Sequence, residues 1–183
     1  MNFLNTVRSW GVVSKTLHWL IVLLIINQWI IMERAESLGM AAKLQAIGLH
    51  KSLGMTIFML AIIRLVWRLL NPVPSLEGLT KSWERRLAAL SHVLLYGLIF
   101  SLPLSGWLMS SARNFPVSWF NQFQFPDLVP ASQELYRSMQ DLHHLLFWAL
   151  TAVALLHVAG ALKHHFIDRN EVLRRMLPFG GVK

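Results

Sequence analysis

The sequence predicts an all-α membrane protein built as a bundle of four transmembrane helices, and three observations support this fold class. Hydrophobic residues make up 55% of the 183 residues and charged residues only 14%, where a soluble domain carries about 25% charged residues. Four apolar segments are each long enough to cross a hydrocarbon core of about 30 Å as a helix. Histidines lie inside these segments, although ionisable side chains are costly in a bilayer.

The expected spans cover residues 12–32, 44–70, 86–110 and 138–166, and together they form one membrane domain over residues 1–183. We expect the first segment to be a retained span, because no small-residue cleavage site follows it. The second span stops at the NPVP sequence that begins at Asn71, where proline removes a backbone donor and restricts the preceding residue. Pro103 lies within the third span and is expected to kink it, which neighbouring helices in a bundle tolerate.

The connection between the third and fourth spans, NFPVSWFNQFQFPDLVPASQ, is rich in aromatic residues and proline. Trp is also frequent in the whole chain, with eight residues against two Tyr. Aromatic residues gather where a membrane meets water. We therefore expect this connection to be a loop that lies on the membrane surface and covers a cofactor.

Lysine and arginine predict the orientation of the chain. With the N terminus inside, 12 of the 17 Lys and Arg residues fall on the cytoplasmic side and 5 on the opposite side. Cytoplasmic loops carry such an excess of positive charge. The sequence thus predicts a multi-pass membrane protein with both termini in the cytoplasm. The same spans make lipid a better partner than nucleic acid for a chain of net charge +8.

Four histidines are predicted to form two pairs at two depths. His143 and His157 are 14 residues apart, which places them within about 40° on one helix face and roughly 21 Å apart along the axis. In the predicted orientation His18 lies at the depth of His157, and His50 at the depth of His143. This arrangement suggests two bis-histidine haems stacked across the membrane. Because the chain has no cysteine, any haem is held non-covalently, as b type.

Other residues are alternatives to this ligand set. His144 competes with His143, but 13 positions place it about 140° away from the face of His157. His92, near the cytoplasmic end of the third span, could replace His18 or His157 or contact a propionate. Met55 and Met59 could supply axial sulfur, although methionine in a membrane more often packs.

Basic residues at the cytoplasmic end suggest two further roles. Arg64 and Arg68 lie 14 and 18 residues beyond His50, on the same helix face, so either guanidinium could pair with a haem propionate. The alternative is that both side chains extend toward the lipid headgroups. His164 and His165 lie beyond the apolar core, where they could exchange protons with a quinone or belong to a solvated basic tail.

Several motifs give the chain a family resemblance over nearly its whole length. They are LHWL, LHKSLG with IIRLVWRLL, SHVLLYGLIFSLPLSGWLM, LHHLLFWALTAVALLHVAGALKHHF and LRRMLP. Together they resemble the prokaryotic cytochrome b561 family, in which four helices hold two b haems. The resemblance implies haem ligation by His18, His50, His143 and His157. It also implies contact with ubiquinone near the KHH sequence, which suggests His164.

One branch of that family oxidises superoxide at the periplasmic face and passes the electron to ubiquinone, so we expect a membrane oxidoreductase with superoxide as the leading donor. Lys51, Arg113 and Arg137 lie on the outer side and could attract this small anion, or could bind headgroups instead. Three alternatives remain for the function: a quinone-coupling cytochrome b subunit of a dehydrogenase or hydrogenase, a quinol-oxidising carrier, and a haem-free bundle that transports or scaffolds.

Overall fold

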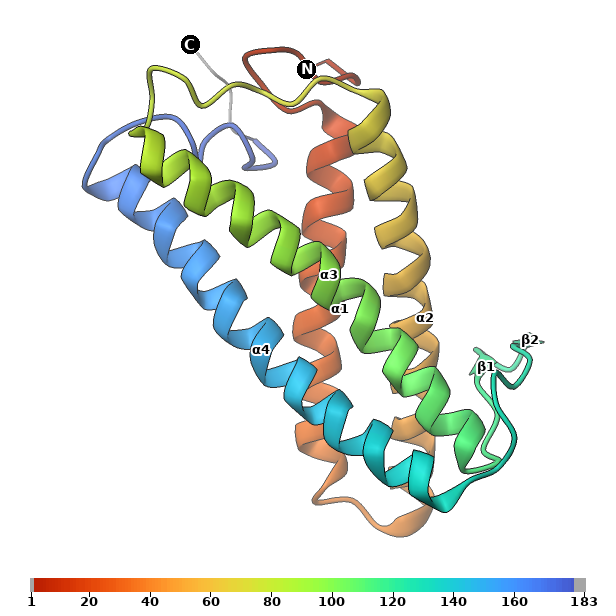
Figure 1. Ribbon diagram of the computed structural model, residues 1–183. Coiled ribbons are helices and arrows are strands. Elements are labelled where there is room, and N and C mark those ends of the chain that lie inside the picture. The colour runs from red at the N-terminus through yellow and green to blue at the C-terminus, as the bar shows by residue number, and fades with distance from the viewer. Residues whose placement is uncertain (1, 180–183) are drawn as a thin grey trace. The chain divides into compact units, whose positions relative to one another are not determined.

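The computed structural model describes residues 2–179, and most of that part of the chain is helical (Figure 1). The helices are α1 (Val12–Ala35), α2 (Met40–Leu70), α3 (Ser82–Ala112) and α4 (Gln133–Phe166). All of these helices are long and apolar enough to cross a membrane. The predicted all-α fold with four membrane-length helices is therefore confirmed.

Helix α1 begins at residue 12 and helices α2 and α4 end at residues 70 and 166, as expected, whereas the other helix ends lie two to five residues beyond the expected limits. α3 begins at Ser82 rather than at residue 86, and the carboxylate of Glu84 accepts the backbone N–H of Lys81 at 2.8 Å. α4 begins at Gln133 rather than at residue 138, and the backbone N–H of Leu135 donates to the hydroxyl of Ser132 at 3.3 Å. Hydrophobicity finds the membrane part of a helix, whereas these polar side chains cap the helix in the interfacial region.

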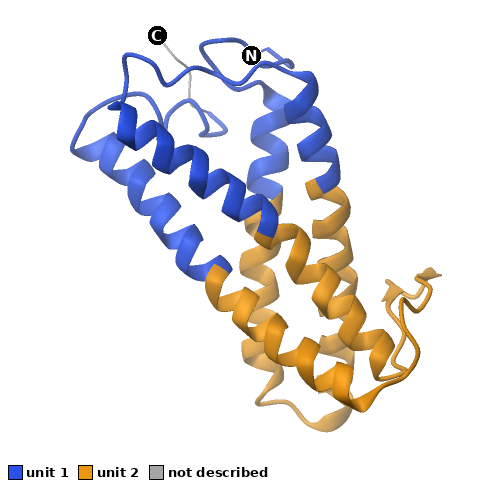
Figure 2. Ribbon diagram, viewed as in Figure 1, with its two compact units in different colours: residues 1–20, 62–97, 150–183 blue, residues 21–61, 98–149 orange. Residues whose placement is uncertain are grey.

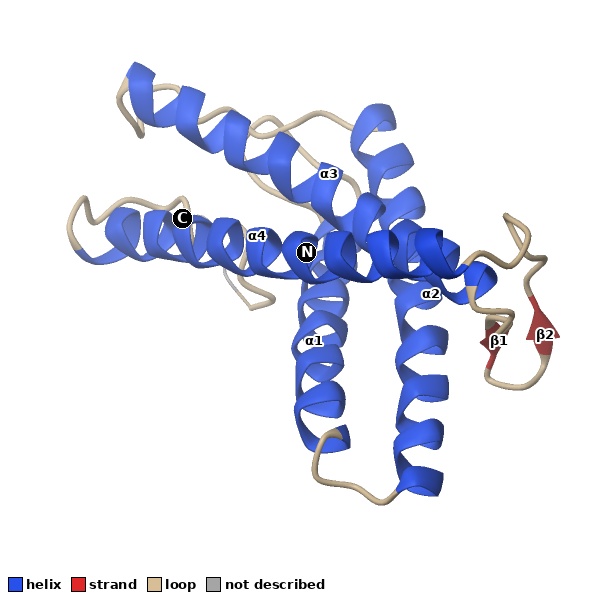
Figure 3. Cartoon of the chain, turned by 60° about the horizontal axis from the view of Figure 1, so that its bottom comes forward, coloured by secondary structure: helices blue, strands red, loops and turns tan. Residues whose placement is uncertain are grey.

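The aromatic connection between α3 and α4 contains a short hairpin that the sequence did not predict (Figure 3). Strands β1 (Ser118–Trp119) and β2 (Phe123–Gln124) are antiparallel, and Trp119 lies opposite Phe123. The turn has positive φ at Phe120 (47°) and Asn121 (58°), and asparagine is one of the residues that tolerate this region. Strands of two residues are too short to give an alternating pattern, so sequence periodicity could not reveal them.

The chain forms two compact units (Figure 2). Unit 1 comprises Met1–Leu20, Ile62–Gly97 and Leu150–Lys183, and unit 2 comprises Ile21–Ala61 and Leu98–Ala149. Each of the four helices therefore contributes one segment to each unit. The expected histidine pairs divide in the same way, because His18 and His157 fall in unit 1 while His50 and His143 fall in unit 2.

Loops and chain ends are joined by hydrogen bonds within unit 1. The indole of Trp19 donates to the carbonyl of Met176 at 2.8 Å, and the side chain of Asn5 donates to the carbonyl of Pro72 at 3.1 Å. Asn5 also accepts the hydroxyl of Ser14 at 2.7 Å. These bonds fix the N-terminal and C-terminal segments at one end of unit 1.

Large apolar side chains cover the outer surface of the helices. Leu145, Trp148 and Leu156 on α4 are 66%, 66% and 72% exposed, whereas Ile21 and Ala61 are each only 1% exposed. A soluble monomer rarely exposes a continuous apolar surface of this kind. The exposed side chains suit contact with lipid, which agrees with the four membrane-length helices.

Candidate functional site

Unit 2 brings together His50 of α2 and His143 of α4. Their ring centres are 6.1 Å apart and their planes meet at 76°. Two imidazoles that bind opposite sides of one metal through bonds of about 2 Å have ring centres roughly 6 Å apart. His144 is exposed, so the neighbouring histidine points away from this pair.

The ring of His143 is held by residues of α3. Its Nδ1 lies 3.0 Å from the hydroxyl oxygen of Ser105, and the ring also hydrogen-bonds the backbone carbonyl of Leu102. A Cβ atom at Gly106 would lie 3.2 Å from Cε1 of the same ring, so glycine leaves room for it. Contacts at Nδ1 fix the ring orientation and leave Nε2 as the nitrogen that can bind a metal.

Unit 1 collects three histidines from three helices. The rings of His92 and His157 are 5.2 Å apart between centres, with an interplanar angle of 66°. His18 lies within electrostatic range of both. The ring of His92 hydrogen-bonds the carbonyl of Ala88 one turn earlier in α3. The expected partners His18 and His157 are thus in one cluster, and His92 adjoins them as a third imidazole.

Two arginines of α2 face the same cluster. The guanidinium of Arg64 lies 5.8 Å from the ring centre of Tyr96 and is within electrostatic range of His18 and His157. Arg68 lies 6.0 Å from the ring centre of Tyr96 and 5.9 Å from that of Trp10.

A small cavity is lined by Trp10, Ser14, Arg64, Arg68, Tyr96 and Met176. Two guanidiniums beside aromatic rings suit an anionic group such as a propionate. Tyr96 was missed in the sequence, although it follows His92 by one helical turn.

The residues of both units fit b-type haem by three structural criteria. The donor sets are imidazoles, which bind haem iron without a covalent link to the porphyrin. Among the described residues, the buried Nδ1 atoms of His18 and His50 lack hydrogen-bond partners, so these rings are not committed to other contacts. Gly106 supplies space beside His143. In unit 1 the geometry allows His92 as well as His18 opposite His157.

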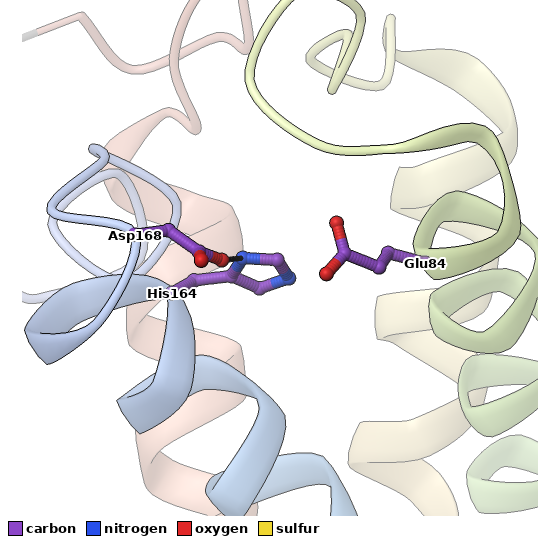
Figure 4. Close-up of side chains that lie close together, drawn as sticks. All are labelled: Glu84, His164 and Asp168. Atoms are coloured by element: carbon purple, nitrogen blue, oxygen red, sulfur yellow. Dashed lines mark hydrogen bonds and ion pairs between the residues drawn. The ribbon is translucent and has the colours of Figure 1, made fainter.

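The C-terminal end of α4 carries a network of charged side chains within unit 1 (Figure 4). Nδ1 of His164 lies 2.6 Å from Asp168, and the ammonium of Lys163 donates to Asp168 at 2.7 Å and also to Glu84. Figure 4 shows the imidazole of His164 between the two carboxylates. The hydrogen bond from Lys163, followed by that from His164, holds the pKa of Asp168 below its usual value.

The side chains of this network are spaced like the ligands of a metal ion, but the network already contains the positive charge of Lys163. Ligand atoms of Glu84, His164 and Asp168 lie within 4.8 Å of one another. The ammonium of Lys163 bridges the two carboxylates, so it supplies the positive charge that a metal ion would bring. The next residue, His165, differs: its buried Nδ1 has no hydrogen-bond partner within residues 2–179. The sequence signal for Asp168 was its spacing of four residues from His164.

The basic residues expected on the outer side belong to unit 2 and contact the aromatic connection and α4. The ammonium of Lys51 donates to the carbonyl of Phe115 at 2.8 Å and lies 3.4 Å from the centre of its ring. Arg113 donates to the hydroxyl of Tyr136 at 2.8 Å. Arg137 is exposed. Lys51 therefore holds the connection on α2, in addition to any role in attracting anions.

Comparison with known proteins identifies the family of the chain. The family model for prokaryotic cytochrome b561 matches residues 9–179. The chain is 33% identical to "Cytochrome b561 homolog 2" of Escherichia coli (strain K12), over 97% of this chain and 95% of the relative. It is 28% identical to "Cytochrome b561 homolog 1" of the same organism, over 90% and 96% of the two chains.

A third relative has a name that states an activity. The chain is 26% identical to "Probable superoxide oxidase CybB" of Yersinia pestis, over 93% of this chain and 97% of the relative. The matches to this protein and to the family model extend over nearly the full length and include every membrane-length helix of the described chain. The chain therefore belongs to the prokaryotic cytochrome b561 family, whose members are bacterial membrane proteins that carry electrons with b-type haem.

Proposed function

We propose that this protein is a di-haem cytochrome that carries electrons across the inner membrane from a donor at the outer face to ubiquinone at the cytoplasmic face. Superoxide is the leading donor. The observation that carries the proposal is the presence of a separate histidine group in each unit, one around His50 and His143 and one around His18 and His157. A bound b-type haem supplies reversible one-electron exchange at each group.

The direction of flow rests on the distribution of charge and on the relatives. The predicted orientation, with 12 basic residues inside and 5 outside, predicts that His18 and His157 lie toward the cytoplasmic side and His50 and His143 toward the periplasmic side. The relative from Yersinia pestis is named a probable superoxide oxidase, which supports a donor of this kind. Two superoxide anions would each lose one electron to become dioxygen. One quinone would gain these two electrons and two protons to become quinol.

Residues of unit 2 would attract and admit the donor. Lys51, Arg113 and Arg137 carry positive charge near the outer end, which favours the approach of a small anion. The hydrogen bonds of Lys51 to Phe115 and of Arg113 to Tyr136 hold two of these charges in fixed positions. Fixed charges raise the association rate more than the affinity, so their effect depends on ionic strength.

Residues of unit 1 would serve the acceptor. Arg64 and Arg68 would balance the charge of a haem propionate, since both guanidiniums line the cavity beside Tyr96. His164 would supply protons to the reduced quinone, with Asp168 fixing its orientation through the 2.6 Å contact at Nδ1. His165 is the alternative donor, because its buried Nδ1 lacks a partner among the described residues.

Stopped-flow spectroscopy of purified, haem-loaded protein tests this proposal. Superoxide should reduce the haems rapidly, and ubiquinone should then reoxidise them. The double variant Lys51→Gln, Arg113→Gln should slow the reduction by roughly three- to tenfold and weaken its dependence on ionic strength. His164→Ala should slow reoxidation and leave the reduction unchanged.

Arg8→Gln is the matched control for the loss of positive charge, because Arg8 is exposed and belongs to unit 1. It should leave the reduction by superoxide unchanged. Superoxide that fails to reduce fully loaded protein would exclude it as the donor. A pyridine haemochrome assay that gives one haem per chain would exclude the di-haem assignment itself.

A further inference from the structure

Gln28 is an uncharged polar residue within the apolar α1 helix, and its side chain reaches a neighbouring helix inside unit 2. Its Nε2 donates to the backbone carbonyl of His50 on α2 at 2.8 Å. Its Oε1 is buried and accepts no hydrogen bond from any residue in the described part of the chain. Burial of an amide oxygen that accepts no hydrogen bond costs free energy, particularly in a membrane, where no water can supply the missing donor.

The ring of His50 also contains a buried polar atom, Nδ1, that has no hydrogen-bond partner within residues 2–179. If Nε2 binds a metal, Nδ1 carries the proton and must donate it, because a ligating histidine usually gives this N–H to an acceptor. A buried acceptor of Gln28 and a buried donor of His50 thus belong to residues that are already hydrogen-bonded to each other.

His143, the other histidine of the pair in unit 2, has a contact at Nδ1 of the kind that the His50 ring lacks. Nδ1 of His143 has its contact with Ser105 at 3.0 Å, and the ring also meets the carbonyl of Leu102. One ring of the pair in unit 2 is therefore oriented by α3, whereas the other has no such contact in the described chain. α1 offers an acceptor for it in Gln28.

Gly54 leaves room for the Gln28 carboxamide. A Cβ atom at Gly54 would lie 3.3 Å from Nε2 of Gln28, so a larger residue would press against the amide. A carboxamide carries its donor and its acceptor on one planar group. For Oε1 to bond the His50 ring while Nε2 stays near the carbonyl of the same residue, the side-chain torsions of Gln28 must change.

We propose that Gln28 is the positioning residue of His50: its Oε1 accepts the Nδ1–H of the ring when His50 binds haem. The proposal rests on the proposed function, because it requires His50 as a haem ligand. The hydrogen bond would fix the ring plane and the tautomer. It would also make the imidazole a stronger electron donor, which favours ferric iron and lowers the reduction potential of the haem in unit 2.

Redox titration and electron paramagnetic resonance of the full-length, haem-loaded protein test this role. Gln28→Leu removes the acceptor and should raise one of two midpoint potentials, by roughly 60 mV if the equilibrium constant changes tenfold. The low-spin signal of the same haem should shift, and the other haem should not change. In a His157→Ala background, where the haem of unit 1 should be lost, the remaining haem should show the same shift.

Two further variants separate positioning from a general effect on packing. Asn27→Leu changes the adjacent polar residue of α1, which is exposed, and should leave both potentials unchanged. Gln28→Glu keeps an acceptor oxygen but loses the donor to the His50 carbonyl, so its potential should equal the wild-type value or fall below it. If Gln28→Leu does not fold, Gln28→Glu decides, because a raised potential there would overturn the proposal.

The outcomes also distinguish this inference from the proposed function. Two haems per chain with potentials that are the same in wild type and Gln28→Leu would overturn the role of Gln28 alone. Equal shifts in Gln28→Leu and Asn27→Leu would also overturn it, because they would indicate a packing effect. Fewer than two haems per wild-type chain would instead overturn the di-haem assignment on which the inference rests.

Discussion

The two units hold the same type of ligand in different chemical surroundings. In unit 2, Nδ1 of His143 contacts the hydroxyl of Ser105, the backbone carbonyl of His50 accepts the amide of Gln28, and Lys51 lies within electrostatic range of His50. In unit 1, His18 and His157 lie within electrostatic range of the guanidinium of Arg64, and Lys163 of α4 binds Asp168 just beyond the end of that helix. Hydroxyl and amide groups therefore accompany the histidines of unit 2 together with one ammonium, whereas in unit 1 a guanidinium lies within electrostatic range of both expected ligands.

This difference suits the chemistry that we propose for each unit. The oxidation of a one-electron donor such as superoxide requires no proton at unit 2. Quinone reduction takes up protons, so titratable groups such as His164 would be useful at unit 1. A positive charge near a haem favours its reduced state, so in the proposed mechanism Arg64 would favour electron transfer to the haem of unit 1.

Removal of the ligands should give the largest effect and tests whether the units are separate. His50→Ala and His143→Ala should each lose the haem of unit 2, and His18→Ala and His157→Ala should each lose that of unit 1. Each variant should therefore retain about half of the haem in a pyridine haemochrome assay, because each pair supplies one complete axial set.

His144→Ala and His92→Ala are the controls for this experiment. His144 is exposed, so its loss should leave both haems in place. His92→Ala should retain both haems if His18 is the partner of His157. Loss of the haem of unit 1 in His92→Ala, together with its retention in His18→Ala, would assign His92 as the ligand instead.

The Arg64→Met variant should give an intermediate effect and tests the role of charge in unit 1. Loss of a guanidinium near His18 and His157 should lower the midpoint potential of the haem of unit 1. The expected shift is roughly 60 mV, which corresponds to a tenfold change in the equilibrium constant of a one-electron reduction. Redox titration measures the change. The haem of unit 2 serves as the internal control, and equal shifts in both potentials would contradict a local effect.

Asp168→Asn should give the smallest effect and tests the network at the end of α4. The pKa of Asp168 is lower in the folded protein, because Lys163 and His164 donate hydrogen bonds to its carboxylate. Its contribution to stability is therefore fully present above the unfolded pKa of about 3.9 and is lost as the pH falls through the folded value.

Thermal unfolding across a pH series measures this contribution. At pH 7 the Tm of Asp168→Asn should be lower than that of the wild type by roughly 1–3 °C, and the difference should vanish at the most acidic pH that the protein tolerates. Asp141→Asn is the matched control, because Asp141 is an exposed acid of α4 that belongs to unit 2. A constant difference at every pH would contradict an electrostatic origin.

The long apolar segments predicted the helices. The spacing of the histidines predicted which of them share a helix face, because residues on one face recur with the period of the helix. The interval of 14 residues predicts that His143 and His157 share one face of α4, and the exposure of His144 agrees with it. The polar first turns of α3 and α4 and the hairpin were missed, since caps and two-residue strands depend on single polar contacts rather than on a repeated pattern.

The sequence by itself determined the membrane class, the four apolar helices and the histidines on their faces, because lipid requires apolar surfaces and internally bonded helices. Only the tertiary structure decided which groups surround each histidine. Tyr96, Ser105 and Gln28 each contact a residue of another helix, and these contacts depend on the rotation of each helix about its axis. The same reason holds for Lys163, whose partner Glu84 begins another helix and carries no signal in the local sequence.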